Sequence, residues 1–127
     1  MDYLLDTHTL LWLIFDSDRL SSVAHEIILD RNNRKHISIS TIWEISIKNR
    51  IGKLPLPDGL VPIFSEIEMN GFGIVEISRP CIEVYNKLPL LHRDPFDGII
   101  IATAILGNME IVTTDKNIQK YDVRWKW

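Results

Sequence analysis

The 127-residue chain is 46% hydrophobic and 24% charged with a formal net charge of −3, which predicts one globular domain over residues 1–127 and argues against a broadly basic nucleic-acid-binding surface. Its single cysteine, Cys81, excludes an intramolecular disulfide and favours a reducing compartment. The longest apolar run, Ile99–Leu106, is too short to cross a bilayer, so we expect a cytoplasmic protein without a membrane partner.

The N-terminal half alternates between patterns of buried strands and of helices. Ser21 or Ser22 can cap a helix around residues 20–28, and Ser40 or Thr41 can cap a helix over about 40–50, which would end at Gly52. In chain order, we predict a strand over 3–5, helices over 9–15 and around 20–28, a strand over 36–39, and helices over about 40–50 and 60–67.

The C-terminal half continues this alternation. We predict a strand over 73–77, a helix that starts at Pro80 and closes at Pro89, a helix over 95–106, and strands over 110–113 and 123–125. Such alternation predicts an α/β fold with a parallel sheet and helices on both of its faces. Ligands in these folds bind beyond the carboxyl ends of the strands.

Two acids are expected at that edge of the sheet. Asp6 follows the first predicted strand, and Asp115 follows the strand over 110–113. Each precedes a predicted helix start, so each can also serve as an N-cap. Position alone therefore leaves both interpretations open.

Glu44 lies inside an apolar helical segment, where a buried carboxylate needs a cation or a hydrogen-bonding partner. Lys48, one helical turn later, can pair with Glu44 or contact a substrate phosphate. Asp94 and Asp97 flank Pro95-Phe96 in a pattern that resembles a capping box, with Asp94 as N-cap. Asp97 is the better candidate metal ligand of the two.

The remaining motifs exclude several other chemistries. The four histidines have no zinc-binding spacing, and no phosphate-binding glycine loop or serine-hydrolase elbow is present. Only His92, close to Asp94, is of interest as a site residue. The aromatic residues form no stacking stripe, and we expect Trp12, Trp43 and Phe96 to serve the core.

Four segments together resemble the PIN-domain family, specifically the VapC-type toxins of toxin–antitoxin pairs. They are Leu4–His8, Ser40–Lys48, His92–Asp97 and Val112–Asp115, and the resemblance covers essentially the whole chain. It implies a PIN-like three-layer sandwich around a mostly parallel sheet of four to five short strands. One departure is Gly98, where arginine often follows the third acid in this subgroup.

The resemblance also implies an activity, a site and partners. The implied activity is that of a Mg²⁺- or Mn²⁺-dependent endoribonuclease, which cleaves RNA by metal-assisted hydrolysis. The implied role is that of a toxin that a small antitoxin inhibits, and the implied assembly is a homodimer. Clustered carboxylates repel one another unless a divalent cation binds, and oxygen-rich sites suit Mg²⁺ or Mn²⁺. The implied catalytic and metal-binding residues are Asp6, Glu44, Asp97 and Asp115, with Asp94, Thr113, Thr7 and Lys48 as accessory residues.

Two alternatives remain at this stage. A catalytically silent PIN scaffold would bind only a protein partner and would show no affinity for divalent metal. A receiver-like signalling domain has a similar length and an acidic Mg²⁺ pocket. That architecture needs paired acids after the first strand and a phosphoacceptor aspartate after a middle strand, where this chain has Glu76.

Overall fold

Five short parallel strands form a single sheet in the computed structural model, which describes residues 1–127. The strands are β1 (Asp2–Leu5), β2 (Arg34–Ser38), β3 (Gly73–Val75), β4 (Glu110–Val112) and β5 (Trp125–Lys126). Their order across the sheet is β3-β2-β1-β4-β5, and every neighbouring pair is parallel. The expectation of a parallel sheet with four to five strands is therefore confirmed.

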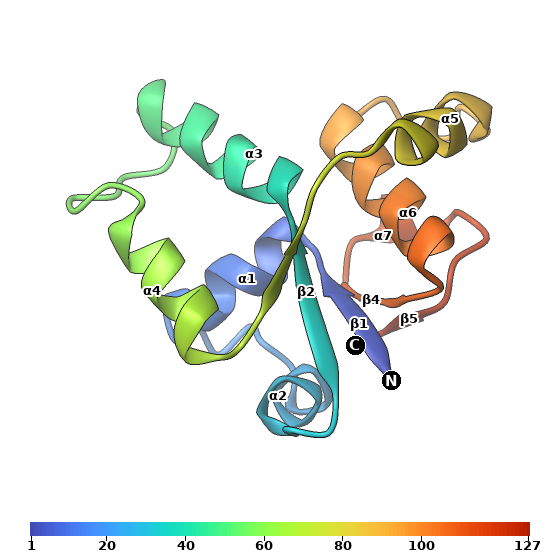
Figure 1. The fold of residues 1–127 in the computed structure, drawn as a ribbon. Helices are drawn as coiled ribbons and strands as arrows, with labels where there is room; N and C mark the ends of the chain where they lie inside the picture. The colour runs from blue at the N-terminus through green and yellow to red at the C-terminus, as the bar shows by residue number, and fades with distance from the viewer.

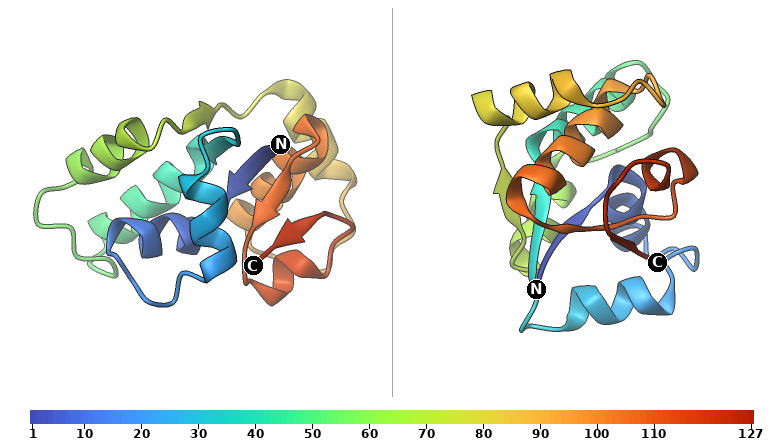
Figure 2. Two further views of the ribbon diagram at one scale, coloured as in Figure 1. Left: turned by 90° about the horizontal axis from the view of Figure 1, so that it is seen from below. Right: turned by 90° about the vertical axis from the view of Figure 1, so that its right-hand side faces the viewer.

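Seven helices cover the two faces of this sheet. They are α1 (Thr7–Ile14), α2 (Ser22–Leu29), α3 (Ile39–Arg50), α4 (Val61–Met69), α5 (Arg79–Lys87), α6 (Pro95–Gly107) and α7 (Lys116–Gln119). Helices α1, α3 and α4 lie on one side of the strands, and α5, α6 and α7 lie on the other (Figure 1). In Figure 1 and the right-hand view of Figure 2, α2 and α5 lie at opposite ends of the molecule.

The core follows from the two-residue period of the strands. Leu5 and Ile37 point into a large cluster with side chains of α1 to α4, whereas Leu4 and Ile111 point to the opposite face and pack with α6 and α7. All four side chains are fully buried. Strands β1 and β4 thus anchor helices on both faces, which explains their runs of consecutive apolar residues.

The strand order reverses at β1. The chain moves from β1 to β2 and β3 in one direction, then returns past β1 to β4 and β5 in the other. The carboxyl ends of β1 and β4 are neighbours, with Leu5 in register with Val112. Such a reversal is where α/β sheets bind ligands, because the flanking connections leave toward opposite faces.

Several helix starts differ from the sequence-based prediction by one or two residues, and the capping residues explain two of these differences. Helix α1 begins at Thr7 rather than Thr9, because Asp6 is its cap. Helix α3 begins at Ile39, because the Ser38 hydroxyl accepts a hydrogen bond from the Ser40 amide, so capping by Ser40 or Thr41 was the wrong prediction. The physical reason is that β2 pairs with β3 as far as Ser38, so the helix starts at the next residue.

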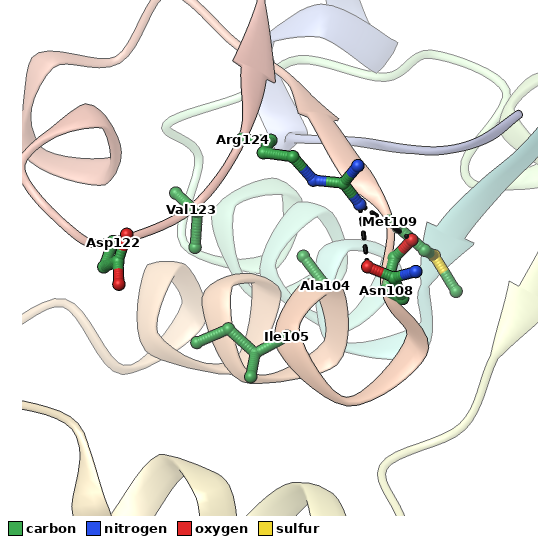
Figure 3. Close-up of a pocket in the computed structure, with 7 residues that line it drawn as sticks. All are labelled: Ala104, Ile105, Asn108, Met109, Asp122, Val123 and Arg124. Atoms are coloured by element: carbon green, nitrogen blue, oxygen red, sulfur yellow. Dashed lines mark hydrogen bonds between the residues drawn. The ribbon is translucent and has the colours of Figure 1, made fainter.

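A surface hollow of about 250 Å³ lies at the other end of α6 from the candidate acids. Asn108 and Arg124 line it, and the Arg124 guanidinium donates hydrogen bonds to the backbone and side-chain oxygens of Asn108 (Figure 3). Asn108 lies eleven residues after Asp97, which corresponds to roughly 16 Å along the helix axis.

No helix of the protein is both long and apolar enough to cross a membrane.

Candidate active site

Asp6 lies directly beyond β1, and both of its carboxylate oxygens are hydrogen-bonded. Oδ1 accepts from the Thr9 amide at 2.9 Å and lies 2.6 Å from the Thr9 hydroxyl, while Oδ2 accepts from the Thr113 hydroxyl. The side chain is almost fully buried. Burial raises the pKa of Asp6 above its usual value, and the hydrogen bonds from Thr113 and Thr9 partly oppose this rise. Asp6 is therefore both a helix cap and a candidate site residue.

Thr113 connects the first acid to the last across the sheet reversal. It follows β4, is fully buried, donates to Asp6 and accepts from the Asp115 amide at 2.9 Å. Asp115 itself caps α7, because its Oδ1 accepts from the Asn117 amide at 2.8 Å. The other carboxylate oxygen of Asp115, Oδ2, makes no hydrogen bond to the protein.

Glu44 is buried on the inner face of α3, and each of its oxygens has a partner. Oε1 accepts from the Thr7 hydroxyl at 2.7 Å, and Oε2 accepts from the Lys48 ammonium at 2.7 Å. Thr7 belongs to the first turn of α1, so this contact joins α1 to α3. Lys48 is partly exposed, which leaves its ammonium accessible from solvent.

Asp94 and Asp97 lie at the N-terminus of α6. Asp94 caps the helix, with Oδ1 accepting from the Phe96 amide at 2.9 Å and the Asp97 amide at 3.4 Å. Asp97 is free of that role, and its Oδ2 lies 3.1 Å from His92 Nε2. The division between a capping acid and a free acid agrees with the prediction from the sequence.

Negative charge converges on Asp97. Burial, followed by the charges of four neighbouring acids, raises the pKa of Asp97 from 3.8 to about 8. In decreasing order of effect these acids are Asp94, Asp115, Glu44 and Asp6. The fold thus gathers acids from four separate segments at one place, which is the arrangement that the sheet reversal predicts.

Residues 3–124 match the PIN domain family. The chain is a PIN-domain protein. This match leaves no support for the receiver-like alternative. No curated protein matches the sequence.

Several solved structures share this PIN fold over nearly their full length. VapBC2 of Rickettsia felis, bound to a DNA fragment from its promoter, is 20% identical with a TM-score of 0.76, covering 100% of this chain and 99% of that chain. VapBC-1 of nontypeable Haemophilus influenzae is 21% identical with a TM-score of 0.69, covering 99% and 97%. VapBC-5 of Mycobacterium tuberculosis, from the VapBC family of toxin–antitoxin systems, is 11% identical with a TM-score of 0.64, covering 98% and 95%.

The donor chemistry of this PIN domain fits a divalent cation. Its candidate ligands are carboxylate oxygens, which Mg²⁺ and Mn²⁺ prefer. The tightest group comprises His92, Asp94 and Asp97, whose ligand atoms lie within 4.8 Å of one another. Asp6, Glu44 and Asp115 do not join this group at that spacing, although their charges act on Asp97. The high pKa of Asp97 shows that the cluster needs a proton or a cation to offset its charge.

Two site features of the PIN domain were only partly visible in the sequence. The proximity of His92 to Asp94 drew attention to this histidine, but its contact with Asp97 depends on the path of the loop before α6. Trp43 was predicted to serve the core, and this is wrong because 60% of its side chain is exposed. Glu44 takes the inward-facing position on α3, which turns the preceding residue outward.

Proposed function

We propose that the protein is a Mg²⁺- or Mn²⁺-dependent endoribonuclease that acts as the toxin of a toxin–antitoxin pair. The observation that carries this proposal is the convergence of carboxylates on Asp97 beside the reversal between β1 and β4. A cluster of this kind has a large unfavourable charge without a cation, so it is suited to metal binding rather than to stability. Membership in the PIN-domain family supports a nuclease.

Within this proposal, Asp6 and Asp97 are the primary metal ligands. Glu44 and Asp115 bind directly or through ordered water, and Asp94 is an accessory acid that mainly caps α6. When bound, the cation supplies activation of the attacking water and stabilisation of charge on the departing oxygen. These ligands are supported by the burial of Asp6 and Glu44 and by the carboxylate oxygens that every member of the set offers.

The hydroxyl and ammonium groups around the acids would orient them. Thr113 and Thr9 hold Asp6 in one rotamer, and Thr7 holds one oxygen of Glu44. Lys48 neutralises Glu44 in the protein alone, and its exposed ammonium is suitably placed to contact a phosphate of the substrate. Such preorganisation lowers the cost of assembling the site when RNA binds.

Cleavage of a single-stranded RNA in Mg²⁺ or Mn²⁺ tests the proposal. We expect cleavage by the wild type, loss of at least about 100-fold in Asp97→Asn, and no change in Asp58→Asn, a matched control at an exposed loop acid. Calorimetric titration with Mn²⁺ should show binding that Asp97→Asn weakens. A wild type that neither cleaves RNA nor binds metal would favour the silent scaffold.

We also propose a small antitoxin and a second copy of this chain as protein partners. The neighbours of similar fold include VapBC assemblies, which supports the first. The chain also exposes many large apolar side chains, including those of Leu29, Val61, Met69 and Leu90. Such surfaces are typical of interfaces. Light scattering as a function of protein concentration should detect a dimer, and a monomer at all concentrations would contradict the proposal of a second copy as partner.

A further inference from the structure

An exposed tryptophan is the neighbour in sequence of one of the acids, and its ring is in contact with a second aromatic ring. Trp43 immediately precedes Glu44 on α3, and its ring is packed against Phe96, which immediately precedes Asp97 on α6. The two ring centroids are 5.4 Å apart and the ring planes meet at 73°, an edge-to-face contact. Each aromatic residue is thus one residue away from an acid of the site.

The contact fixes the orientation of Trp43 without burying it. Phe96 is partly buried and belongs to the first turn of α6, where Asp94 caps the backbone and limits movement. Tryptophan is usually well buried, so a side chain that stays 60% exposed while held by a second aromatic ring offers surface for a ligand.

The chemistry of such a surface matches an unpaired nucleobase. Single-stranded RNA is bound by stacking its splayed bases on aromatic side chains, while charged groups handle its phosphates. Here the aromatic surface and the acids are adjacent in sequence on two helices that both contribute acids to the site. A phosphate bound through a cation at these acids would therefore lie beside the helix positions that carry Trp43 and Phe96.

We propose that Trp43, supported edge-on by Phe96, stacks on a base adjacent to the cleaved phosphodiester and positions single-stranded RNA in the site. The inference rests on the proposed ribonuclease function. Stacking tolerates any base, so it favours unpaired over paired RNA rather than one sequence over another.

Kinetics on a short single-stranded RNA test this role. We expect Trp43→Ala to raise KM roughly tenfold with kcat changed less, and Trp43→Phe to retain most of the wild-type KM. Trp125→Ala is the matched control, because Trp125 is also exposed (42%) but lies on β5. A substrate with abasic positions on both sides of the cleaved bond should reduce the difference between wild type and Trp43→Ala to less than twofold.

Two results would overturn the role of Trp43. One is an unchanged KM in Trp43→Ala. The other is a rise in KM that is equally large on the abasic substrate and is accompanied by loss of a dimer in light scattering, which would make Trp43 a protein contact instead.

A binding measurement separates this inference from failure of the proposed activity. Titration with oligouridylate in the absence of metal should quench tryptophan fluorescence in the wild type and in Trp125→Phe, but not in Trp43→Phe. Quenching in this titration, combined with no RNA cleavage in Mg²⁺ or Mn²⁺, would keep the stacking site and overturn the nuclease. Equal quenching in the wild type and Trp43→Phe, or none in the wild type, would overturn the stacking site.

Discussion

Asp97 shows which local effect dominates at the site. Its place in the first turn of α6 favours a negative charge by about 0.3–1 kcal/mol. One pKa unit corresponds to about 1.36 kcal/mol, so a pKa of about 8 means that burial and repulsion by the neighbouring acids outweigh the helix terminus. Near neutral pH the residue therefore holds a proton in the absence of a cation.

This proton makes the stability of the metal-free protein depend on pH. The pKa of Asp97 in the folded state, about 8, lies above its value of about 3.9 in an unfolded chain, so the folded state holds the proton more tightly. The contribution of this bound proton to the free energy of unfolding is complete below about pH 4 and is lost as the pH rises through 8. We expect the free energy of unfolding in EDTA to fall over this range, and Asp97→Asn to flatten the fall. Urea titrations at several pH values would measure this free energy. Parallel curves of the free energy of unfolding against pH for the wild type and Asp97→Asn would contradict the prediction.

Lys48 is the counterion of a buried acid in the absence of metal. Lys48→Ala leaves Oε2 of Glu44 without its donor, so we expect a loss of about 1–3 kcal/mol in the free energy of unfolding. Lys53→Ala, at an exposed position without such a partner, should have an effect below about 0.5 kcal/mol. Equal urea midpoints for Lys48→Ala and the wild type would show that the pair contributes nothing to stability.

At the level of helices and strands, the sequence predicted the order and type of the elements better than their ends. The strand ends before Asp6 and Asp115 could be predicted because apolar runs stop there. The start of α3 could not, since Ser38, Ser40 and Thr41 are all suitable caps and the choice depends on how far β2 pairs with β3. The exposure of Trp43 depends on which face of α3 meets α6, which an apolar helix sequence does not specify.

Helices α5 and α6 approach closely at Gly98. A Cβ atom at this position would lie 2.4 Å from Cε2 of Tyr85, so the tyrosine ring occupies the space of a side chain. The departure from the arginine often found here therefore has a structural counterpart: Tyr85 covers the helix directly after Asp97. A larger residue at position 98 would have to displace this ring.

The packing predicts a coupling between the two positions. Alanine is favoured over glycine in a helix by about 1 kcal/mol, but overpacking costs about 1–3 kcal/mol. We expect Gly98→Ala to be neutral or destabilising in the wild type and stabilising by about 1 kcal/mol in a Tyr85→Ala background. Urea denaturation of the four proteins would measure this cycle, and the same effect in both backgrounds would contradict it.

At the level of the whole molecule, the two larger core clusters are built on the same central strands, β1 and β4. A single domain over residues 1–127 therefore stays a prediction that unfolding can test. We expect thermal unfolding to be one cooperative transition, with coincident midpoints by circular dichroism and tryptophan fluorescence. Two separated transitions would indicate that the α1–α4 and α5–α7 sides unfold independently.

The hydrogen bond from Thr113 to Asp6 joins residues that are 107 positions apart. Asp6 follows the first strand of this fold, but its partner strand β4 is made only after six helices and three strands. A nascent chain that has not reached Asp115 therefore lacks the last acid and the contact that fixes the first. A ribosome carrying such an unfinished chain would not be exposed to the proposed nuclease activity of its own product.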